Sequence, residues 1–184
     1  MKTICIINLK GGVAKTISAA NIAHIIATVH GKRVLLIDCD KQGNISKMFG
    51  IHGYNAPTIA ELLTDRDASI HEIISPSKYP NLDIITANMT LLRANMQILL
   101  DTTRPQQTRL RTALAIGEIE HVYDYCVIDC APDLNMSTIN ALVACDDVLI
   151  PIKIDKFAFD GLAELIEQIN NTRTDLNPGL HLRG

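Results

Sequence analysis

Two short, unbroken apolar runs constrain the fold of this chain more than any other feature of its sequence. Residues 33–38 read RVLLID and residues 125–129 read YCVID, so each run ends in an aspartate. Both runs are too short for a helix, and continuous apolar character is typical of a central strand in a parallel sheet, where helices cover both faces. We therefore expect the two terminal aspartates to lie at the same edge of one sheet.

The rest of the chain alternates between strand-like and helix-like stretches. We expect strands at residues 3–8, 82–86 and 147–152, and helices at residues 15–29, 58–63, 91–100, 107–120 and 157–171. This alternation predicts an α/β fold, with a doubly wound, mainly parallel sheet and helices on both faces. Because no linker-like segment interrupts it, residues 1–184 are predicted to form a single domain. Residues 179–184 resemble the start of another strand, and we expect the C-terminal part of the domain to be missing.

The turn between the first strand and the first helix has the residue types of a phosphate-binding loop. A helix N-terminus presents unpaired N–H groups and a partial positive charge, which together attract anions. Lysine suits the β- and γ-phosphates, and a threonine hydroxyl suits Mg²⁺. The alternative is a tight turn with solvated lysines. We expect ATP or ADP to bind with Mg²⁺ at Lys10, Gly11, Gly12, Val13, Ala14, Lys15, Thr16 and Ile17.

Three aspartates at the carboxyl ends of the two apolar runs are candidates for the chemistry. Asp129 ends one run, where a carboxylate can hold Mg²⁺ directly or through water; the alternative is that it caps the following helix. Asp38 and Asp40 end the other run, close to the crevice in which ligands bind in open α/β sheets. The alternative for this pair is a plain turn role.

Three segments carry a resemblance to a known superfamily. Residues 10–16 (KGGVAKT) resemble the deviant phosphate loop Lys-Gly-Gly-x-Gly-Lys-Thr of the ParA/Soj and MinD ATPases, except at Ala14. Residues 35–44 (LLIDCDKQGN) resemble the motif usually written Asp-Pro-Gln-Gly-Asn, with Lys41 in place of proline. Residues 124–132 (DYCVIDCAP) resemble the Walker B strand, with Ala131 where a proline is common. The Gln-Gly-Asn sequence favours the partition branch over the MinD branch.

The resemblance implies a P-loop NTPase fold and assigns roles to single residues. Asp40 is expected to position or activate the attacking water, while Asp38 supports the Mg²⁺ site formed with Thr16 and Asp129. Lys15 offsets phosphate charge in its own subunit. Lys10 is expected to reach across an ATP-sandwich dimer and stabilise the transition state, which couples hydrolysis to dimerisation. The alternative for Lys10 is a solvated lysine at the end of the strand.

The implied function is that of a cytoplasmic, nucleoid-associated ATPase that segregates plasmid, mobile-element or chromosomal DNA. Such a protein cycles between a monomer and an ATP-dependent homodimer, and a centromere-binding ParB-like partner stimulates slow hydrolysis. One alternative is a metal-cluster carrier of the same superfamily. The five cysteines argue against it, because they lie in apolar runs without a Cys-x-x-Cys pair and are expected to be buried free thiols. The other alternative is a hydrolysis-impaired regulator, because Ala14 and Ile17 depart from the family pattern.

The charge of the chain bears on whether it binds DNA. The net charge is −3, although residues 1–50 carry seven Lys and Arg against two Asp. The basic residues and adenine contacts typical of the family lie nearer the C-terminus, so we expect weak DNA binding by this chain and nonspecific DNA binding by the full-length protein. Four arginines could touch DNA, but a solvated face is favoured for Arg93, Arg104, Arg109 and Arg111.

Two further expectations concern the membrane and the position of Ala14. No signal-like segment or apolar run of about 18 residues is present, so no membrane association is expected. If Ala14 requires a positive φ or a very close approach to phosphate, its methyl group costs roughly 1 kcal/mol or more. If its φ is negative, alanine is nearly harmless. Because residues at a helix start need negative φ, we predict negative φ and a site that binds nucleotide but hydrolyses it slowly.

Overall fold

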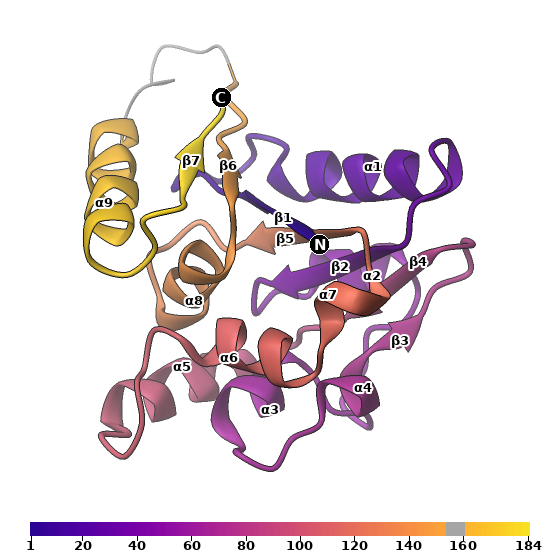
Figure 1. Cartoon of the computed structure of the whole chain (residues 1–184), viewed down its shortest axis with the longest axis horizontal. Coiled ribbons are helices and arrows are strands. Elements are labelled where there is room, and N and C mark those ends of the chain that lie inside the picture. Colours follow the sequence, from indigo (N-terminus) through magenta and orange to yellow (C-terminus); the bar gives the residue numbers. More distant parts are fainter. Residues whose placement is uncertain (154–160) are drawn as a thin grey trace.

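The sheet places the carboxyl ends of its central strands along one edge. The computed structural model describes residues 1–153 and 161–184, and within them seven strands pair in the order β3-β4-β2-β5-β1-β6-β7 (Figure 1). All pairs are parallel except β3 with β4. The strands are β1 (Lys2–Ile6), β2 (Val34–Cys39), β3 (Ser75–Pro76), β4 (Leu82–Ile85), β5 (Tyr125–Cys130), β6 (Asp147–Leu149) and β7 (His181–Leu182).

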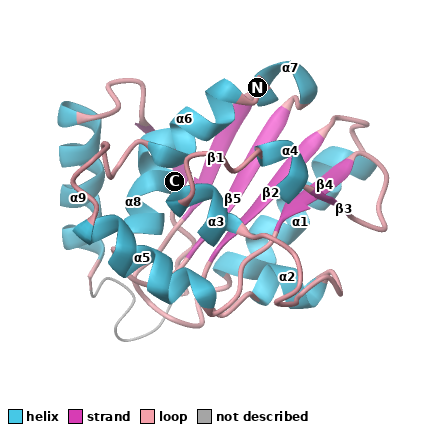
Figure 2. Ribbon diagram, turned by 90° about the horizontal axis from the view of Figure 1, so that it is seen from below, coloured by secondary structure: helices cyan, strands magenta, loops and turns pink. Residues whose placement is uncertain are grey.

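Helices cover both faces of the sheet, as Figure 2 shows. One face carries α1 (Lys15–Thr28) and α2 (Asn44–Met48). The other carries α3 (Ile59–Thr64), α5 (Thr90–Leu100), α6 (Arg109–Ile116) and α8 (Met136–Ala144), and α9 (Leu162–Asp175) packs against α8. Two single turns, α4 (Ile70–Ile73) and α7 (Ile119–Val122), complete the helices described. The predicted doubly wound α/β fold is confirmed.

Small side chains bring α1 close to the sheet. Ala19, Ala23 and Ala27 recur at four-residue spacing, are fully buried, and pack in one core cluster with Ile6, Leu36 and Val127 from the three central strands. Residues four apart lie on one face of a helix, and alanine keeps that face shallow. Because α1 follows the turn after β1, this packing fixes the N-terminus of α1 at the carboxyl edge of the sheet.

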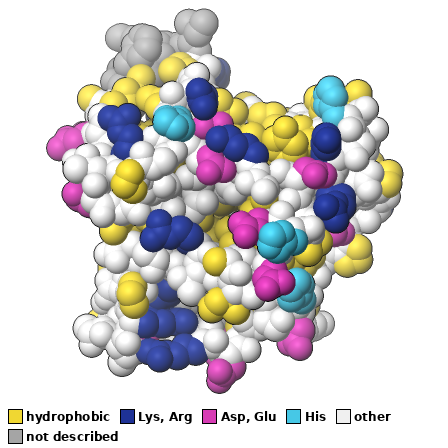
Figure 3. All heavy atoms as spheres, in the orientation of Figure 1, with side chains coloured by type: hydrophobic (Ala, Val, Ile, Leu, Met, Phe, Trp, Pro, Cys, Tyr) yellow, Lys and Arg dark blue, Asp and Glu magenta, His cyan; other side chains and the backbone are white. Residues whose placement is uncertain are grey.

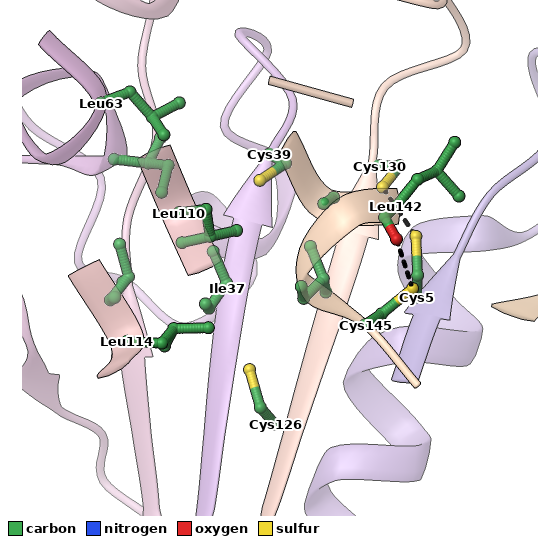
Figure 4. Packing of buried hydrophobic residues seen from close by; sticks show 14 of the residues in the cluster. Cys5, Ile37, Cys39, Leu63, Leu110, Leu114, Cys126, Cys130, Leu142 and Cys145 are labelled. Carbon is green, nitrogen blue, oxygen red and sulfur yellow. Dashed lines mark hydrogen bonds between the residues drawn. The ribbon is translucent and has the colours of Figure 1, made fainter. Parts of the chain in front are cut away.

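All five cysteines belong to the core on the opposite face. They are buried free thiols, as predicted. Figure 4 shows them beside leucine and isoleucine side chains, and the Sγ atoms of Cys5 and Cys130 lie 3.2 Å apart. Burial raises the pKa of the Cys126 thiol well above its usual range, and nearby Cys145 and Asp146 add to the shift. A buried thiol with a raised pKa stays protonated and packs as a small apolar side chain.

Several predicted boundaries differ from the structure. The expected helix over residues 107–120 is divided into α6 and α7 at Gly117 and Glu118, because Glu118 adopts a left-handed conformation with φ 51°. The expected helix over residues 157–171 is described only from Leu162, and residues 157–160 lie outside the described residues. Four elements were not predicted: α2, α4, β3 and α8. Asn135, whose side chain accepts a hydrogen bond from the Thr138 N–H, is a capping signal that marks the start of α8.

In the part of the chain that the structure describes, every helix is too short or too polar to cross a membrane.

Candidate nucleotide-binding site

The loop from β1 to α1 contains two left-handed residues, Gly12 (φ 72°) and Ala14 (φ 65°, ψ 24°). Ala14 is the N-cap of α1, and its side chain makes no capping hydrogen bond. The prediction of negative φ at Ala14 was therefore wrong. The prediction assumed that a residue at a helix start needs a negative φ. That holds for residues inside a helix, whereas an N-cap residue lies just outside and takes non-helical angles. Left-handed residues within such a loop are typical of the concave backbone nests that bind phosphate.

Lys15 is a buried cation at the first position of α1. Lys15 is only 7% exposed, and its Nζ atom donates a hydrogen bond of 2.7 Å to the Lys10 carbonyl oxygen. Burial lowers the pKa of Lys15, and the carboxylates of Asp129 and Asp40 oppose that shift. Lys15 lines the pocket, where its ammonium group can exchange its carbonyl partner for a phosphate oxygen.

Asp129 is the penultimate residue of β5 and is fully buried. Among the described residues, neither of its oxygens has a hydrogen-bond partner. Burial raises its pKa to about 7, and the nearby Thr16 hydroxyl lowers it in part. Buried carboxylates are costly unless they are paired or bind a metal ion. The residues present therefore fit a divalent cation that Asp129 and the Thr16 hydroxyl would hold together.

Asp38 is the register partner of Asp129 in the neighbouring strand β2, but its surroundings differ. Its Oδ2 atom accepts hydrogen bonds from the Ser46 amide (3.0 Å) and the Ser46 hydroxyl (2.8 Å), and its Oδ1 atom accepts one from the Asp40 amide (3.2 Å). Burial raises the pKa of Asp38 to about 6 against these hydrogen bonds. Asp38 thus holds the segment from Asp40 to Ser46 in place, beside Asp129 in the neighbouring strand.

The segment after β2 brings Asp40 to the pocket wall. The Oδ1 atom of Asp40 accepts a hydrogen bond of 2.9 Å from the Gln42 amide. Gly43 is left-handed (φ 62°), and a Cβ atom there would lie 2.6 Å from the Ala87 carbonyl oxygen. Only glycine fits this turn, which sets the direction in which the chain leaves Asp40.

These elements enclose an open pocket of about 820 Å³. Seven of the predicted residues line it: Gly11, Gly12, Ala14, Lys15, Thr16, Ile17 and Asp40. Asp129 and Asp38 lie behind the wall, and Val13 is buried. The backbone amide of Lys10 donates a hydrogen bond to the Asn8 side chain.

The sequence analysis did not predict the role of α2. Three of its residues line the pocket beside Gln42 and Pro132: Asn44, Lys47 and Met48. The Gln-Gly-Asn motif marked this segment, but nothing in the sequence showed that a helical turn would place Lys47 on the pocket wall.

A family model described as an AAA domain matches residues 1–182. Over the whole chain, 38% of residues are identical to the sporulation initiation inhibitor protein Soj of Bacillus subtilis, and 39% to the chromosome partitioning protein ParA of Myxococcus xanthus. The chain belongs to the ParA/Soj family. It spans 70% of the length of Soj and 63% of the length of that ParA.

Solved structures agree with this family assignment. Cobyrinic acid a,c-diamide synthase from Mycobacterium smegmatis, with a bound ATP analog and magnesium, superposes with a TM-score of 0.90 at 30% identity, covering 99% of this chain and 72% of that one. A plasmid partition protein of Borrelia burgdorferi B31 bound to AMPPNP superposes with a TM-score of 0.81 at 30% identity, covering 98% and 72%.

The four arginines of this ParA/Soj family member have different surroundings: Arg93 and Arg111 are exposed, as favoured, Arg104 is half-buried and Arg109 is buried. The Arg109 side chain is 2% exposed and donates to Asp101 Oδ2 (2.8 Å) and to the Leu63 carbonyl oxygen (3.1 Å). Arg104 donates to the same carbonyl, and Arg111 donates to the Leu176 carbonyl. The prediction was wrong for Arg109 because its guanidinium caps the end of α3. In Figure 3, charges of both signs alternate over the visible face, and Lys and Arg side chains gather near its lower end.

The metal-cluster alternative finds no support among the described residues. They contain no group of three or more His, Cys, Asp or Glu side chains arranged to hold a metal ion. All five thiols are buried in the core rather than displayed on a surface.

Proposed function

We propose that this chain is the nucleotide-binding core of a ParA/Soj-type partition protein that binds ATP with Mg²⁺ and hydrolyses it. The observation that carries the proposal is the buried Asp129 carboxylate, which has no hydrogen-bond partner among the described residues and lies at the same sheet edge as the Lys15-Thr16 loop. A buried, unpaired carboxylate is costly by itself and becomes favourable when it binds a cation. The ATP-analog-bound structures of relatives support the same interpretation.

The phosphates would bind to the loop backbone and to Lys15. On binding, the Lys15 ammonium exchanges the Lys10 carbonyl for phosphate oxygens, which gives a stronger charge-assisted hydrogen bond. The backbone N–H groups at the start of α1 and the helix dipole add partial positive charge. The exposed methyl group of Ala14 lies at the same wall of the pocket.

Thr16 and Asp129 would hold Mg²⁺, which neutralises charge on the β- and γ-phosphates when bound. Asp38 contributes indirectly by holding Ser46 and Asp40. The Asp40 carboxylate, which is 7% exposed and lines the pocket, orients the attacking water and accepts its proton. Lys10 provides the second cation to the partner subunit of an ATP-dependent dimer, where it stabilises the transition state.

The cellular role that fits this chemistry is DNA partition. ATP binding makes the dimer, which engages nucleoid DNA in the full-length protein, and a centromere-binding ParB-like partner stimulates hydrolysis. The names of the relatives, a chromosome partitioning protein and a plasmid partition protein, support this role.

A nucleotide-turnover assay with and without DNA tests the proposal. We expect slow, Mg²⁺-dependent release of phosphate from ATP, with Asp40→Ala as the matched inactive control. If the full-length protein releases no phosphate from ATP either with or without DNA, the hydrolytic role is refuted. Turnover that is unchanged in Asp40→Ala would refute it too.

A second candidate, a nucleotide-binding regulator with impaired hydrolysis, is favoured by two observations at the phosphate loop. Ala14 adopts a conformation that alanine rarely takes, and Ile17 places a 48% exposed apolar side chain on the pocket wall. The same turnover assay separates the two functions, because the regulator binds ATP without releasing phosphate.

A further inference from the structure

The helical turn α2 is anchored in the core and also contributes to the wall of the nucleotide pocket. Ile45 and Ser46 are fully buried. The Ser46 hydroxyl donates a hydrogen bond to Asp38 Oδ2 (2.8 Å) and accepts one from the Ala87 amide (2.9 Å). The next residue, Lys47, is exposed and lines the pocket. The backbone that carries Lys47 is thus held in place by contacts on both sides of β2.

The ammonium group of Lys47 has a neutral partner. Its Nζ atom donates a hydrogen bond of 2.5 Å to the Gln42 carbonyl oxygen. Among the residues that the structure describes, no carboxylate forms an ion pair with Lys47. Lys41, in the same segment, differs because it pairs with Asp133 Oδ2 at 3.3 Å. The charge of Lys47 is therefore not offset by a direct contact and can attract an anion.

Lys15, the cation of the phosphate loop, has the same kind of partner. Its ammonium donates a hydrogen bond to the Lys10 carbonyl oxygen (2.7 Å). Lys15 and Lys47 line one pocket, and they are the only cations among the described residues that do so. An ammonium forms a stronger hydrogen bond with a charged phosphate oxygen than with a neutral carbonyl oxygen. Both lysines can therefore exchange a carbonyl of their own segment for a phosphate.

We propose that Lys47 is a second phosphate-binding cation of the same subunit, contributed to the site by α2. This inference rests on the proposed function and deepens it by adding a residue that contacts the nucleotide. The alternative is a tether, because the Gln42 amide donates a hydrogen bond of 2.9 Å to Asp40 Oδ1. In that case Lys47 would hold Gln42, and thereby Asp40, without touching the nucleotide.

Calorimetric titration with Mg-ADP separates a phosphate contact from a tether. ADP is the probe because the proposed dimer needs ATP, so a contribution from a partner subunit does not enter. Lys47→Ala should weaken Mg-ADP binding about tenfold, since a charge-assisted hydrogen bond is lost. Lys47→Gln keeps a hydrogen-bond donor for the Gln42 carbonyl but loses the charge, and it should bind as weakly as Lys47→Ala. Lys47→Arg keeps the charge and should bind within about twofold of the wild type.

Two further lysines provide matched controls. Lys32→Ala removes an exposed lysine before β2, and Lys41→Ala removes the lysine of the same segment that pairs with Asp133. Both variants should bind Mg-ADP normally, because neither lysine lines the pocket. At about 1 M salt, where the Debye length is ~3 Å, the loss in Lys47→Ala should shrink.

A second measurement locates the contact. The rates at which an amine-reactive reagent labels single lysines of the wild type can be followed by mass spectrometry. Saturating Mg-ADP should slow the labelling of Lys47 severalfold, because a phosphate then covers its ammonium group. The labelling of Lys32 and Lys41 should not change.

Three results would overturn the inference. If the wild type binds no nucleotide, the proposed function fails and the inference fails with it. If the wild type binds Mg-ADP and Lys47→Ala binds it equally well, the proposed function stands and only the role of Lys47 is refuted. A tether predicts wild-type affinity and turnover in Lys47→Gln, together with labelling of Lys47 that Mg-ADP does not slow.

Discussion

Ala14→Gly is the substitution for which the structure gives the sharpest expectation. Ala14 holds φ 65° and ψ 24° at the start of α1, a left-handed conformation that costs alanine roughly 1–2 kcal/mol and costs glycine almost nothing. Glycine also gains conformational freedom in the unfolded chain, which subtracts about 0.4–1 kcal/mol from that benefit. The net effect on the free energy of unfolding should therefore lie between zero and about 1.6 kcal/mol in favour of Ala14→Gly.

Removal of the methyl group should also change catalysis. The methyl group of Ala14 is exposed on the pocket wall, where phosphate oxygens must approach the backbone closely. If crowding and strain together cost about 1 kcal/mol in the transition state, ATP turnover should rise roughly fivefold in Ala14→Gly, because 1.36 kcal/mol corresponds to a factor of ten. The fold should not change.

Thermal unfolding and steady-state phosphate release measure the two effects. Ala115→Gly is the matched control: it makes the same chemical change at an exposed position inside α6, where glycine should destabilise by about 0.5–1 kcal/mol. Equal turnover and equal ATP affinity in Ala14→Gly and the wild type would show that the methyl group is tolerated. Destabilisation of Ala14→Gly as large as that of Ala115→Gly would refute the left-handed conformation itself.

Three further predictions concern other parts of the site. Lys10→Ala should keep ATP binding but lose turnover and ATP-dependent dimerisation, and a wild-type ATP dimer in light scattering together with wild-type turnover would exclude its role in the partner site. The pKa of Asp129 is raised to about 7, so the unfolded chain loses this proton first, and the stability of the nucleotide-free protein should fall as pH rises from about 4 to about 7. Asp129→Asn should therefore raise Tm by several degrees at pH ~8 in EDTA and leave it unchanged near pH ~4; equal Tm differences at both pH values would contradict the raised pKa. This chain should bind duplex DNA weakly even with ATP, because its net charge is −3, and tight binding with a steep salt dependence in a fluorescence assay would oppose that expectation.

The sequence predicted the central sheet and the phosphate loop because their signals are local. Continuous apolar runs, a glycine turn and a Lys-Thr pair are each determined by neighbouring residues, and β2, β5 and the start of α1 were placed within one or two residues of their observed positions. The position of Asp38 and Asp129 at one edge of the sheet followed from the parallel direction of the strands, whereas their direct register pairing was seen only in the structure.

Features that depend on tertiary contacts were not predictable in the same way. Arg109 resembles a surface residue in sequence, but the carbonyl of Leu63 and the carboxylate of Asp101 give its guanidinium a buried set of partners. The conformation of Ala14 depends on how the loop closes onto the helix rather than on helix propensity. Short elements such as α2 lacked a periodic pattern long enough to recognise, and the contact between Lys41 and Asp133 joins distant segments.

Calorimetric titration of the wild type and Lys15→Ala with Mg-ATP tests the central claim most directly. Lys15 is the buried cation of the phosphate loop, and its removal leaves the backbone N–H groups as the loop's own partners for the phosphates. We predict saturable binding to the wild type and to the control Lys32→Ala, and no measurable binding to Lys15→Ala, with circular dichroism showing that all three proteins are folded. Micromolar affinity retained in folded Lys15→Ala would contradict the assignment of residues 10–16 as the phosphate-binding loop.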